Sequence, residues 1–468
     1  MDNSTNKEVK GARKRRRGQK LPEKIAILGA GPTGLGAAYR LHELGYKDWA
    51  IHEKNPYIGG LSASFKDDKG FTWDIGGHVL FSHYEYVDKL VNQLLGNEYL
   101  THQRDAWIWL LNSWVPYPFQ NNIRHLPKEA LLECLLGLIK AQGNRNRSNN
   151  FQEWILSNFG EGIAKYFMLP YNHKVWAHLL KSMAKDWIAE RVSVIDLEKI
   201  LRNIIFEQDE REWGPNSQFR FPLHGGTGGL FSRFMPYIKD HLMLNEEMRE
   251  IDIDKKTVRF SSGREVRYDI LVNTTPLDQL VFRINPAKAS LVQSAKQLKH
   301  NGVFSVGIGI KKACPTKKCW VYFPEDNCHF YRITYFSNYS PNNVPNTQTF
   351  YSLMCETSYS EHKPEDRNTI IDKTIDGLVN AKIITDADRR LIETTHVIQA
   401  EYAYPIPTLE RDRALGVILP HLEEKGIVSR GRFGGWKYEI GNMDHSIMQG
   451  VEVINKILGL EGECKMKV

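Results

Sequence analysis

The chain has 468 residues, which is too long for one small hydrophobic core and predicts two or three domains. Its 41% hydrophobic and 25% charged residues are typical of a soluble globular protein, and no segment approaches the roughly eighteen apolar residues of a membrane span. The formal net charge is +7, but residues 1–24 carry nine Lys or Arg against three acidic residues, so six of the seven net charges lie there. The rest of the chain is nearly neutral, and we expect no nucleic-acid partner.

We expect residues 1–23 to form a disordered basic arm, because a short charge run without interleaved aromatic residues is usually unstructured. A nuclear or nucleic-acid address is the alternative. The arm lacks the apolar core of a signal peptide. The chain has six cysteines, Cys134, Cys314, Cys319, Cys328, Cys355 and Cys464. Their spacing fits no metal-ligand pattern, so we expect reduced thiols, no metal and a cytoplasmic location.

A glycine-rich turn follows the first predicted strand. Ile25–Leu28 is short, apolar and β-branched enough to be a buried parallel strand, and Leu35–Leu44 has helical periodicity. Between them, Gly29 permits a tight turn and Gly31 lets the backbone approach a pyrophosphate. Gly34 lets the helix pack closely on the strand. The N-terminus of the helix would then face phosphate groups with free N–H groups.

A second apolar strand, Trp49–His52, ends at Glu53, an acid placed where a ribose hydroxyl needs an acceptor. Strand, glycine turn, helix and acid together predict a dinucleotide-binding unit. The alternative is that the three glycines form only a tight turn.

More glycines follow, at Gly60 and Gly77, and they decide which dinucleotide we expect. A plain nicotinamide dehydrogenase does not need these extra close backbone approaches, whereas a long FAD threaded through the domain does. We therefore expect FAD. His78 directly follows a glycine pair and is interpreted as a cofactor contact, whereas His83 is interpreted as a core histidine.

The next segment changes from helix to strand to helix. A helix is expected from Tyr84, and Trp107–Trp114 alternates like a strand that Val115–Asn122 interrupts. In this proline-containing stretch Tyr117 and Phe119 are rigid rings that could hold a nucleobase, with core packing as the alternative. The residues that follow predict a helical insertion, with helices over Lys128–Lys140, Phe151–Phe159, Gly162–Met168, Ser182–Arg191 and Asp196–Phe206.

The C-terminal half is rich in predicted strands. The apolar run Ile270–Pro276 indicates a return to the parallel sheet, so the first domain is discontinuous. A closing glycine loop, Gly431–Asp444, precedes a helix at Ser446–Leu458 that we expect to pack on the first domain. Short alternating strands are predicted at Arg249–Asp254, Thr257–Phe260 and Arg264–Arg267. An antiparallel sheet is predicted from the strands Val303–Ile310, Trp320–Phe323, Phe330–Ile333 and Thr349–Cys355, with one helix near Asp366–Ala381.

The predicted fold is therefore α/β: a discontinuous Rossmann-like FAD-binding domain with a helical insertion and an antiparallel β-sheet domain. The expected boundaries are 24–105, 221–300 and 411–468 for the FAD-binding domain, 106–220 for the largely helical substrate domain and 301–410 for the sheet domain.

This order of elements resembles the amine-oxidase-like flavoproteins and, more narrowly, the UDP-galactopyranose mutases of the eukaryotic type. The resemblance runs from about Lys24 to the last helix. It is carried by long strings rich in Trp, Tyr and Pro, namely Gly76–Tyr84, Trp114–Asn122, Tyr322–Cys328 and Gly431–Gly434.

The resemblance implies interconversion of UDP-galactopyranose and UDP-galactofuranose on reduced FAD without net redox change. It implies a covalent adduct between flavin N5 and the anomeric carbon, with UDP as the leaving group. NADPH is implied as the reductant and would have to share the substrate cleft, because the sequence shows no separate nicotinamide fold. The sequence leaves the oligomeric state open, and a homo-oligomer is one alternative.

The resemblance also implies site residues. Arginine suits phosphate geometry, so Arg191 and Arg332 would clamp the diphosphate and, with His78, form the catalytic set. Each assignment has a packing alternative, such as an arginine that only pairs with a core glutamate. The hydroxyl donors would be Tyr322, Tyr404 and Tyr438; the uridine contacts Arg104, Tyr117, Phe119, Gln120 and Asn172; the residues near the sugar and flavin Trp176, Asn216 and His78; and further cofactor contacts Arg432, Asn442 and Asp444.

Two other functions share the predicted fold. An oxidase of the amine-oxidase or protoporphyrinogen type would keep the glycines but require an apolar substrate cavity, and it would consume oxygen. A non-enzymatic prenyl-GTPase chaperone would bind no flavin, and the purified protein would be colourless.

Overall fold

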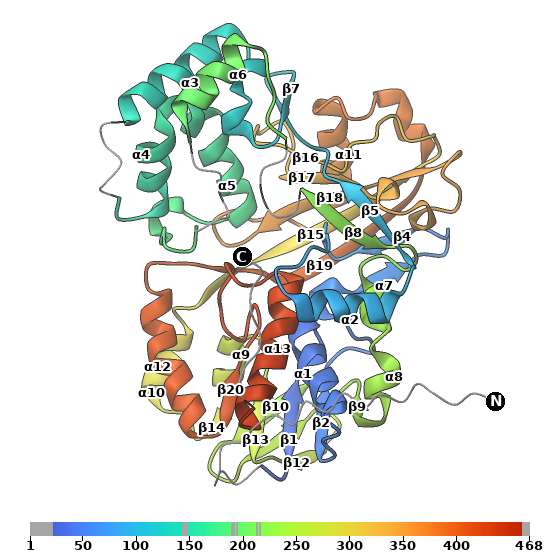
Figure 1. Ribbon diagram of the computed structural model, residues 1–468, viewed down its shortest axis with the longest axis vertical. Helices are drawn as coiled ribbons and strands as arrows, with labels where there is room; N and C mark the ends of the chain where they lie inside the picture. The colour runs from blue at the N-terminus through green and yellow to red at the C-terminus, as the bar shows by residue number, and fades with distance from the viewer. Residues whose placement is uncertain are drawn as a thin grey trace, which may run out of the picture.

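The computed structural model of the protein describes residues 22–142, 148–188, 192, 195–211, 214 and 217–460. The predicted basic arm lies outside this part except for its last two residues, and so do Arg191 and Asn216. The described chain has an α/β fold in which a parallel sheet, a larger mainly antiparallel sheet and a helical layer meet (Figure 1). Within it, no helix is both long and apolar enough to cross a membrane.

Five strands form the parallel sheet that carries the glycine turn. Their order is β20-β13-β1-β2-β9, and every neighbouring pair is parallel. The strands are mostly apolar because both faces of a parallel sheet are covered by other elements. They come from separate parts of the sequence, which confirms the predicted discontinuous fold; they are β1 (Ile25–Leu28), β2 (Trp49–His52), β9 (Leu242–Met243), β13 (Ile270–Asn273) and β20 (Ile427–Ser429).

Helices α1 (Pro32–Glu43) and α13 (Met443–Ile457) pack with their backbones in contact. A Cβ atom on Gly36 would lie 2.4 Å from a backbone oxygen of α13, and one on Gly450 would lie 2.1 Å from a backbone oxygen of α1. Only glycine fits at these crossings. The contact confirms that the last helix packs on the first domain, and it places the N-terminus of α13 beside the glycine turn.

The second large sheet has seven strands in the order β19-β15-β18-β17-β16-β6-β7. Neighbouring pairs are antiparallel except β16 and β6, so the predicted antiparallel sheet contains one parallel pair. Helix α11 (Ile370–Asn380) packs on this sheet. The strands are β6 (Ala106–Leu110), β7 (Ser113–Pro116), β15 (Lys299–Ile310), β16 (Trp320–Tyr322), β17 (Arg332–Tyr335), β18 (Tyr351–Tyr359) and β19 (Ile392–Ile406).

The single strand predicted at Trp107–Trp114 is wrong, because this segment is a hairpin. Leu111 and Asn112 have φ of 52° and 56°, and two successive positive φ values reverse the chain between β6 and β7. A Leu-Asn pair is not the usual glycine-containing hairpin signal, so the alternating pattern concealed the turn.

The predicted helical insertion is present, but one of its helices is not. The helix predicted at Ser182–Arg191 is wrong over its described residues 182–188. Met183 instead forms a β-bridge with Thr408, and the Ala184 N–H donates to the Pro407 carbonyl at 2.8 Å, so this segment is held against the chain after β19. The helices present are α3 (Lys128–Ala141), α4 (Phe151–Ile163), α5 (Leu169–Trp176) and α6 (Leu197–Ile205).

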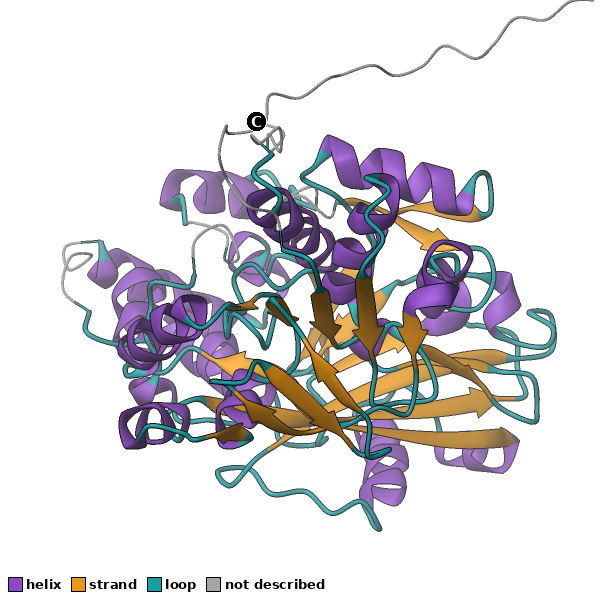
Figure 2. Ribbon diagram, turned by 90° about the horizontal axis from the view of Figure 1, so that it is seen from below, coloured by secondary structure: helices purple, strands orange, loops and turns teal. Residues whose placement is uncertain are grey.

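The remaining elements connect these layers. A small sheet in the order β12-β11-β10-β14 and two pairs, β3 with β4 and β5 with β8, complete the strands. Viewed from below in Figure 2, the strands occupy the middle of the molecule and helices lie around them. These elements are β3 (Ser64–Lys66), β4 (Thr72–Asp74), β5 (Tyr99–Gln103), β8 (Gln218–Pro222), β10 (Met248–Asp252), β11 (Thr257–Phe260), β12 (Glu265–Arg267), β14 (Ile284–Asn285), α2 (Glu85–Leu95), α7 (Gly228–Ser232), α8 (Met235–Ile238), α9 (Leu277–Phe282), α10 (Ala289–Ala295) and α12 (Arg411–Glu424).

Candidate active site

The glycine turn after β1 has the close approaches that the sequence predicts. Gly29 has a φ of +93°, and a Cβ on Gly34 would lie 1.9 Å from the Gly29 carbonyl oxygen. Gly31 faces the second glycine loop, since a Cβ on Gly60 would lie 3.0 Å from the Gly31 Cα. Backbone without side chains, from Gly31 on one loop and Gly60 on the other, therefore lies together at the turn. A close approach to a pyrophosphate requires such an arrangement.

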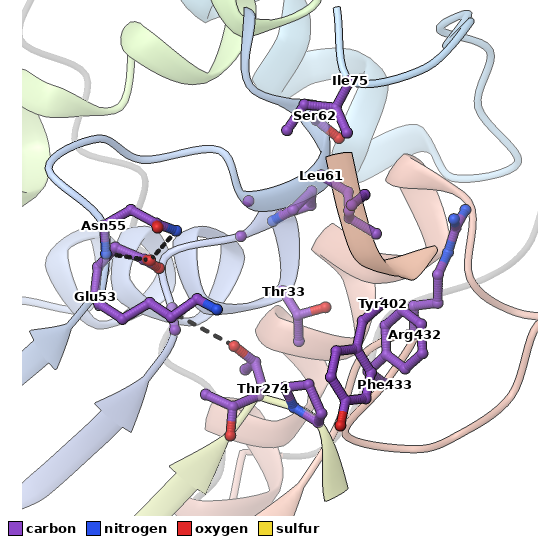
Figure 3. A pocket seen from close by; sticks show the side chains of 18 of the residues that line it. Thr33, Glu53, Asn55, Leu61, Ser62, Ile75, Thr274, Tyr402, Arg432 and Phe433 are labelled. Atoms are coloured by element: carbon purple, nitrogen blue, oxygen red, sulfur yellow. Dashed lines mark hydrogen bonds between the residues drawn. The ribbon is translucent and has the colours of Figure 1, made fainter. Parts of the chain in front are cut away.

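Glu53 joins this turn to the end of β2. Its carboxylate accepts a hydrogen bond from the Ala30 N–H at 2.8 Å. It also accepts from the backbone and side-chain N–H groups of Asn55 at 2.9 and 2.8 Å (Figure 3). A carboxylate has about four acceptor positions. Glu53 can therefore brace the turn and still accept a hydrogen bond from a ribose hydroxyl.

A cavity of about 700 Å³ opens at the turn. Its wall includes the hydroxyl groups of Thr33, Ser62 and Thr274 and the apolar side chains of Leu61 and Ile75 (Figure 3). This volume is within the range of natural small-molecule sites. The predicted cofactor residues that line it are Gly29, Gly31, Glu53, Gly60, His78 and Arg432.

A second cavity, of about 230 Å³, shares part of its wall with the first. His78 and Arg432 line both cavities, so the two are neighbours at these side chains. The rest of the second wall is mixed. Apolar side chains such as Phe81 and Val303 line it together with predicted cofactor and substrate residues, namely Gly77, Arg332, Tyr404, Tyr438 and Asn442.

Arg332 is oriented by a bidentate ion pair with Glu356. Its Nε and Nη2 donate to the carboxylate, Nη2 at 2.8 Å, and the Tyr331 hydroxyl donates to the same carboxylate at 3.2 Å. The Glu356 side chain is only 2% exposed. The arginine thus does pair with a core glutamate. Among the described residues, however, its Nη1 has no hydrogen-bond partner, so this nitrogen can bind an anion in the cavity.

His78 carries no charge at neutral pH. Burial and the nearby Arg432 lower the pKa of His78 to about 4, with Glu356 opposing this shift and Arg332 adding to it. Its buried Nδ1 has no hydrogen-bond partner within the described chain. A neutral ring with an unpaired nitrogen, placed where both cavities meet, suits a ligand that extends from one cavity into the other.

Tyrosine rings stand beside Arg332 and Arg432. The Tyr404 hydroxyl is 3.3 Å from the Tyr331 hydroxyl, and the Arg432 guanidinium lies over the Tyr404 ring at 5.7 Å. Tyr438 packs edge-on against Trp176, with 4.9 Å between ring centroids. Trp176 is only 2% exposed and lines neither cavity, so it supports the tyrosine from behind.

The predicted uridine residues divide into two sets. Tyr117 and Tyr322 are in ring contact at 5.6 Å, and the Arg104 guanidinium lies over the Tyr117 ring at 5.1 Å. Phe119 is fully buried and stacks on Phe167 at 4.6 Å, so in this structure it belongs to the helical core. Core packing is the alternative interpretation of this stretch. It fits Phe119, and it fits Tyr117 less well.

The other predicted residues lie off the two cavities or outside the described chain. Gln120 is buried, and the Asn172 amide donates to a backbone carbonyl of its own helical segment at 2.7 Å. Asp444 lines neither cavity and hydrogen-bonds to His83 and His445. The structure places neither Arg191 nor Asn216, which both fall among the residues it does not describe.

Sequence reasoning missed Glu356, which orients Arg332. It is an isolated acid inside the buried strand β18, whose pattern is otherwise that of a core strand. A buried acid in an apolar strand requires a nearby cation, so Glu356 could have been predicted from the sequence to pair with an arginine or lysine.

Comparisons with known proteins agree with this geometry. A model of flavin-containing amine oxidoreductases matches residues 32–381. A solved structure of reduced UDP-galactopyranose mutase is 43% identical in sequence with a TM-score of 0.91, and the match covers 95% of each chain. This confirms the predicted resemblance to the mutases within the amine-oxidase-like flavoproteins.

More distant matches show the fold or a part of it. A putative protoporphyrinogen oxidase from Exiguobacterium sp. 255-15 has a TM-score of 0.70 at 15% identity, over 93% of this chain and 98% of the other. A 15-cis-phytoene desaturase of Arabidopsis thaliana is 33% identical over 92 residues, which is 20% of this chain and only 16% of the desaturase.

These distant relatives match this chain in fold, or over a short segment of sequence, alone. The family model, in contrast, spans well over half of the sequence, from the glycine turn through the strands that carry Arg332 and Glu356. The chain therefore belongs to the flavin-containing amine oxidoreductase family.

Proposed function

We propose that the protein is an FAD-dependent UDP-galactopyranose mutase, an isomerase of nucleotide sugars. The observation that carries this proposal is the wall of the second cavity, where Arg332, Tyr404 and Tyr438 line a space that shares His78 and Arg432 with the larger, glycine-lined cavity. Such a wall suits an anionic substrate, whereas an oxidase acting on an apolar molecule needs an apolar chamber. The 43% identity to a mutase over nearly the whole chain supports the same choice.

The residues of the larger cavity fit FAD. Bare backbone at Gly31 and Gly60 suits a pyrophosphate, and Glu53 suits a ribose hydroxyl. His78 offers an unpaired ring nitrogen at the end that meets the substrate cavity. When bound and reduced, FAD supplies an electron-rich ring nitrogen as the nucleophile toward an anomeric carbon.

The protein's task is then to hold the sugar and to stabilise the diphosphate as it leaves. Glu356 fixes the guanidinium plane of Arg332 before substrate arrives, so little reorganisation is needed when negative charge develops on the diphosphate. Burial raises the pKa of both Tyr322 and Tyr404, which keeps these hydroxyls protonated as hydrogen-bond donors at working pH. His78 can contact the sugar or flavin without adding charge.

The finer assignments belong to the same proposal. We assign Tyr117, Tyr322 and Arg104 to the uridine side, because their side chains form one contiguous group. NADPH is the proposed reductant and would enter the substrate cleft, and the proposed location is the cytoplasm. Arg191 and Asn216 keep their proposed places near the diphosphate and the sugar.

One experiment tests the function. The purified yellow protein is reduced anaerobically with NADPH, mixed with UDP-galactose and analysed for the furanose nucleotide by chromatography and mass spectrometry. The proposal predicts the furanose isomer with no net consumption of NADPH after the first reduction. Oxygen consumption with an amine or porphyrin substrate and no furanose product would refute it, and so would a colourless protein.

A further inference from the structure

Three side chains outside both cavities form a compact cluster. Asp444 accepts hydrogen bonds from the backbone N–H of His83 at 3.1 Å and from its Nδ1 at 2.8 Å. His445 Nδ1 lies 3.2 Å from the other carboxylate oxygen. The Asp444 side chain is 1% exposed, and the histidines are 16% and 11% exposed. None of the three lines the cavities, so their task is not direct contact with a ligand there.

The cluster joins two separate walls of the second cavity. Residues 76–79 and Phe81 line it on the loop that ends at His83, while Asn442 and Met443 line it just before Asp444. The Phe81 ring also packs edge-on against the His83 ring, with 5.5 Å between centroids. A shift of His83 is therefore passed directly to a cavity-lining ring and to the loop that carries His78.

We propose that Asp444 and His83 are positioning residues that clamp the loop of residues 76–83 to the N-terminus of α13. This differs from the direct cofactor contact that the family resemblance implies for Asp444, and from the core role first given to His83. The inference rests on the proposed function only for the identity of the ligand in the second cavity.

Charge favours such a clamp. Although burial raises the pKa of Asp444, the two histidines and the His83 N–H together lower it to about 2, so the carboxylate stays charged. Asp444 also lies in the first turn of α13, where the helix dipole favours an anion. Hydrogen bonds to a charged acceptor are the stronger kind, and this one connects elements 361 residues apart in sequence.

A metal ion is the rival explanation of a His-Asp-His cluster. Tetrahedral Zn²⁺ with bonds of about 2.0 Å separates its ligand atoms by about 3.3 Å. The 3.2 Å between His445 Nδ1 and the carboxylate is close to this separation, but the 2.8 Å between His83 Nδ1 and the carboxylate is shorter and is an ordinary hydrogen-bond distance. The positive end of α13 also disfavours a cation. The geometry thus favours the hydrogen-bonded clamp.

The test compares three variants of the flavin-loaded protein. His83→Phe removes the ring donor, and His83→Asn keeps an N–H donor near the place of Nδ1. His445→Phe is the matched control. This ring hydrogen-bonds the same carboxylate from the neighbouring residue of the same helix, and it meets the loop only through ring contacts with His83 at 4.9 Å and Tyr84 at 5.6 Å, which a phenyl ring can keep. The readouts are the flavin absorbance and fluorescence, the Kd for UDP, kcat and KM, the melting temperature and the zinc content.

We expect His83→Phe to alter the flavin spectrum and to weaken UDP binding about tenfold, as the loss of one charge-assisted hydrogen bond would. His83→Asn should restore binding to within about threefold, and His445→Phe should stay within about twofold of wild type. The spectrum requires no turnover, so absence of mutase activity in wild type would refute the proposed function and leave the clamp standing. If His83→Phe does not fold, His83→Asn and His445→Phe still test the clamp through the UDP affinities expected for them.

Three results would overturn the clamp. They are a wild-type spectrum and UDP affinity in folded His83→Phe, equal losses in His83→Phe and His445→Phe, and no rescue by His83→Asn. One equivalent of zinc in the wild-type protein that His445→Phe abolishes would also overturn it, in favour of the metal site.

Discussion

The ion pair of Arg332 and Glu356 allows a test that separates anion binding from core stability. Replacing Arg332 by Met leaves the Glu356 carboxylate buried without its cation, and breaking a buried pair in this way costs roughly 3–5 kcal/mol of folding free energy. Adding Glu356→Gln removes the buried charge and keeps a side-chain oxygen that can accept from Tyr331. We therefore expect the double variant to recover to within about 1 kcal/mol of wild type.

UDP affinity should behave differently from stability. If Nη1 of Arg332 binds the diphosphate, its loss removes a charge-assisted hydrogen bond of about 1.5–3 kcal/mol, or roughly 10- to 150-fold in Kd. This loss should appear in Arg332→Met and persist in the stable double variant. Urea unfolding measures the stability, and isothermal titration of the flavin-loaded proteins with UDP measures the affinity.

The reasoning fails on one outcome above all. If the double variant binds UDP as tightly as wild type, Arg332 serves only to neutralise Glu356 and the diphosphate is bound elsewhere. Glu356→Gln alone is the control: it keeps the guanidinium, so UDP binding should fall less than in either variant that lacks Arg332.

Two further predictions concern the turn and the strand beside the cofactor cavity. Gly34→Ala places a Cβ 1.9 Å from the Gly29 carbonyl oxygen, so we expect this variant to lose bound flavin, measured as the ratio of visible to ultraviolet absorbance. Gly416→Ala is the control and should retain flavin, because no described atom outside its own helix lies within 4 Å of the added Cβ. Equal flavin retention by the two variants would contradict the packing argument. Burial, together with Arg264, lowers the pKa of His52 to about 4 against the pull of Glu246, so the folded protein loses stability relative to the unfolded chain as pH falls from 6.5 to 4. His52→Phe removes this dependence. Denaturant unfolding should therefore show wild type losing about 2 kcal/mol more than the variant between pH 7.5 and 5. Equal losses in the two proteins would show that His52 protonates as readily in the folded state as in the unfolded state.

Local patterns predicted the parts of the fold whose cause is local. The strand at Ile25–Leu28, the glycine turn and the acid at Glu53 follow from backbone sterics and strand periodicity within thirty residues, and the structure has them as expected. The same reasoning failed at Leu111 and Asn112. The pairing of β6 with β16 and β7 requires a turn there, although these residues lack the glycine that usually indicates a hairpin turn.

By itself the sequence determined that this chain has a dinucleotide-type turn, apolar runs suited to a parallel sheet and a helical insertion, because each of these depends on residues close together in the chain. Only the tertiary structure decided which polar groups meet. Glu356 on β18 orients Arg332 on β17, and Asp444 on α13 holds His83, although these partners lie 24 and 361 residues apart. Such pairs arise from how sheets and helices pack, and a buried charge shows its partner only when the fold brings the two together.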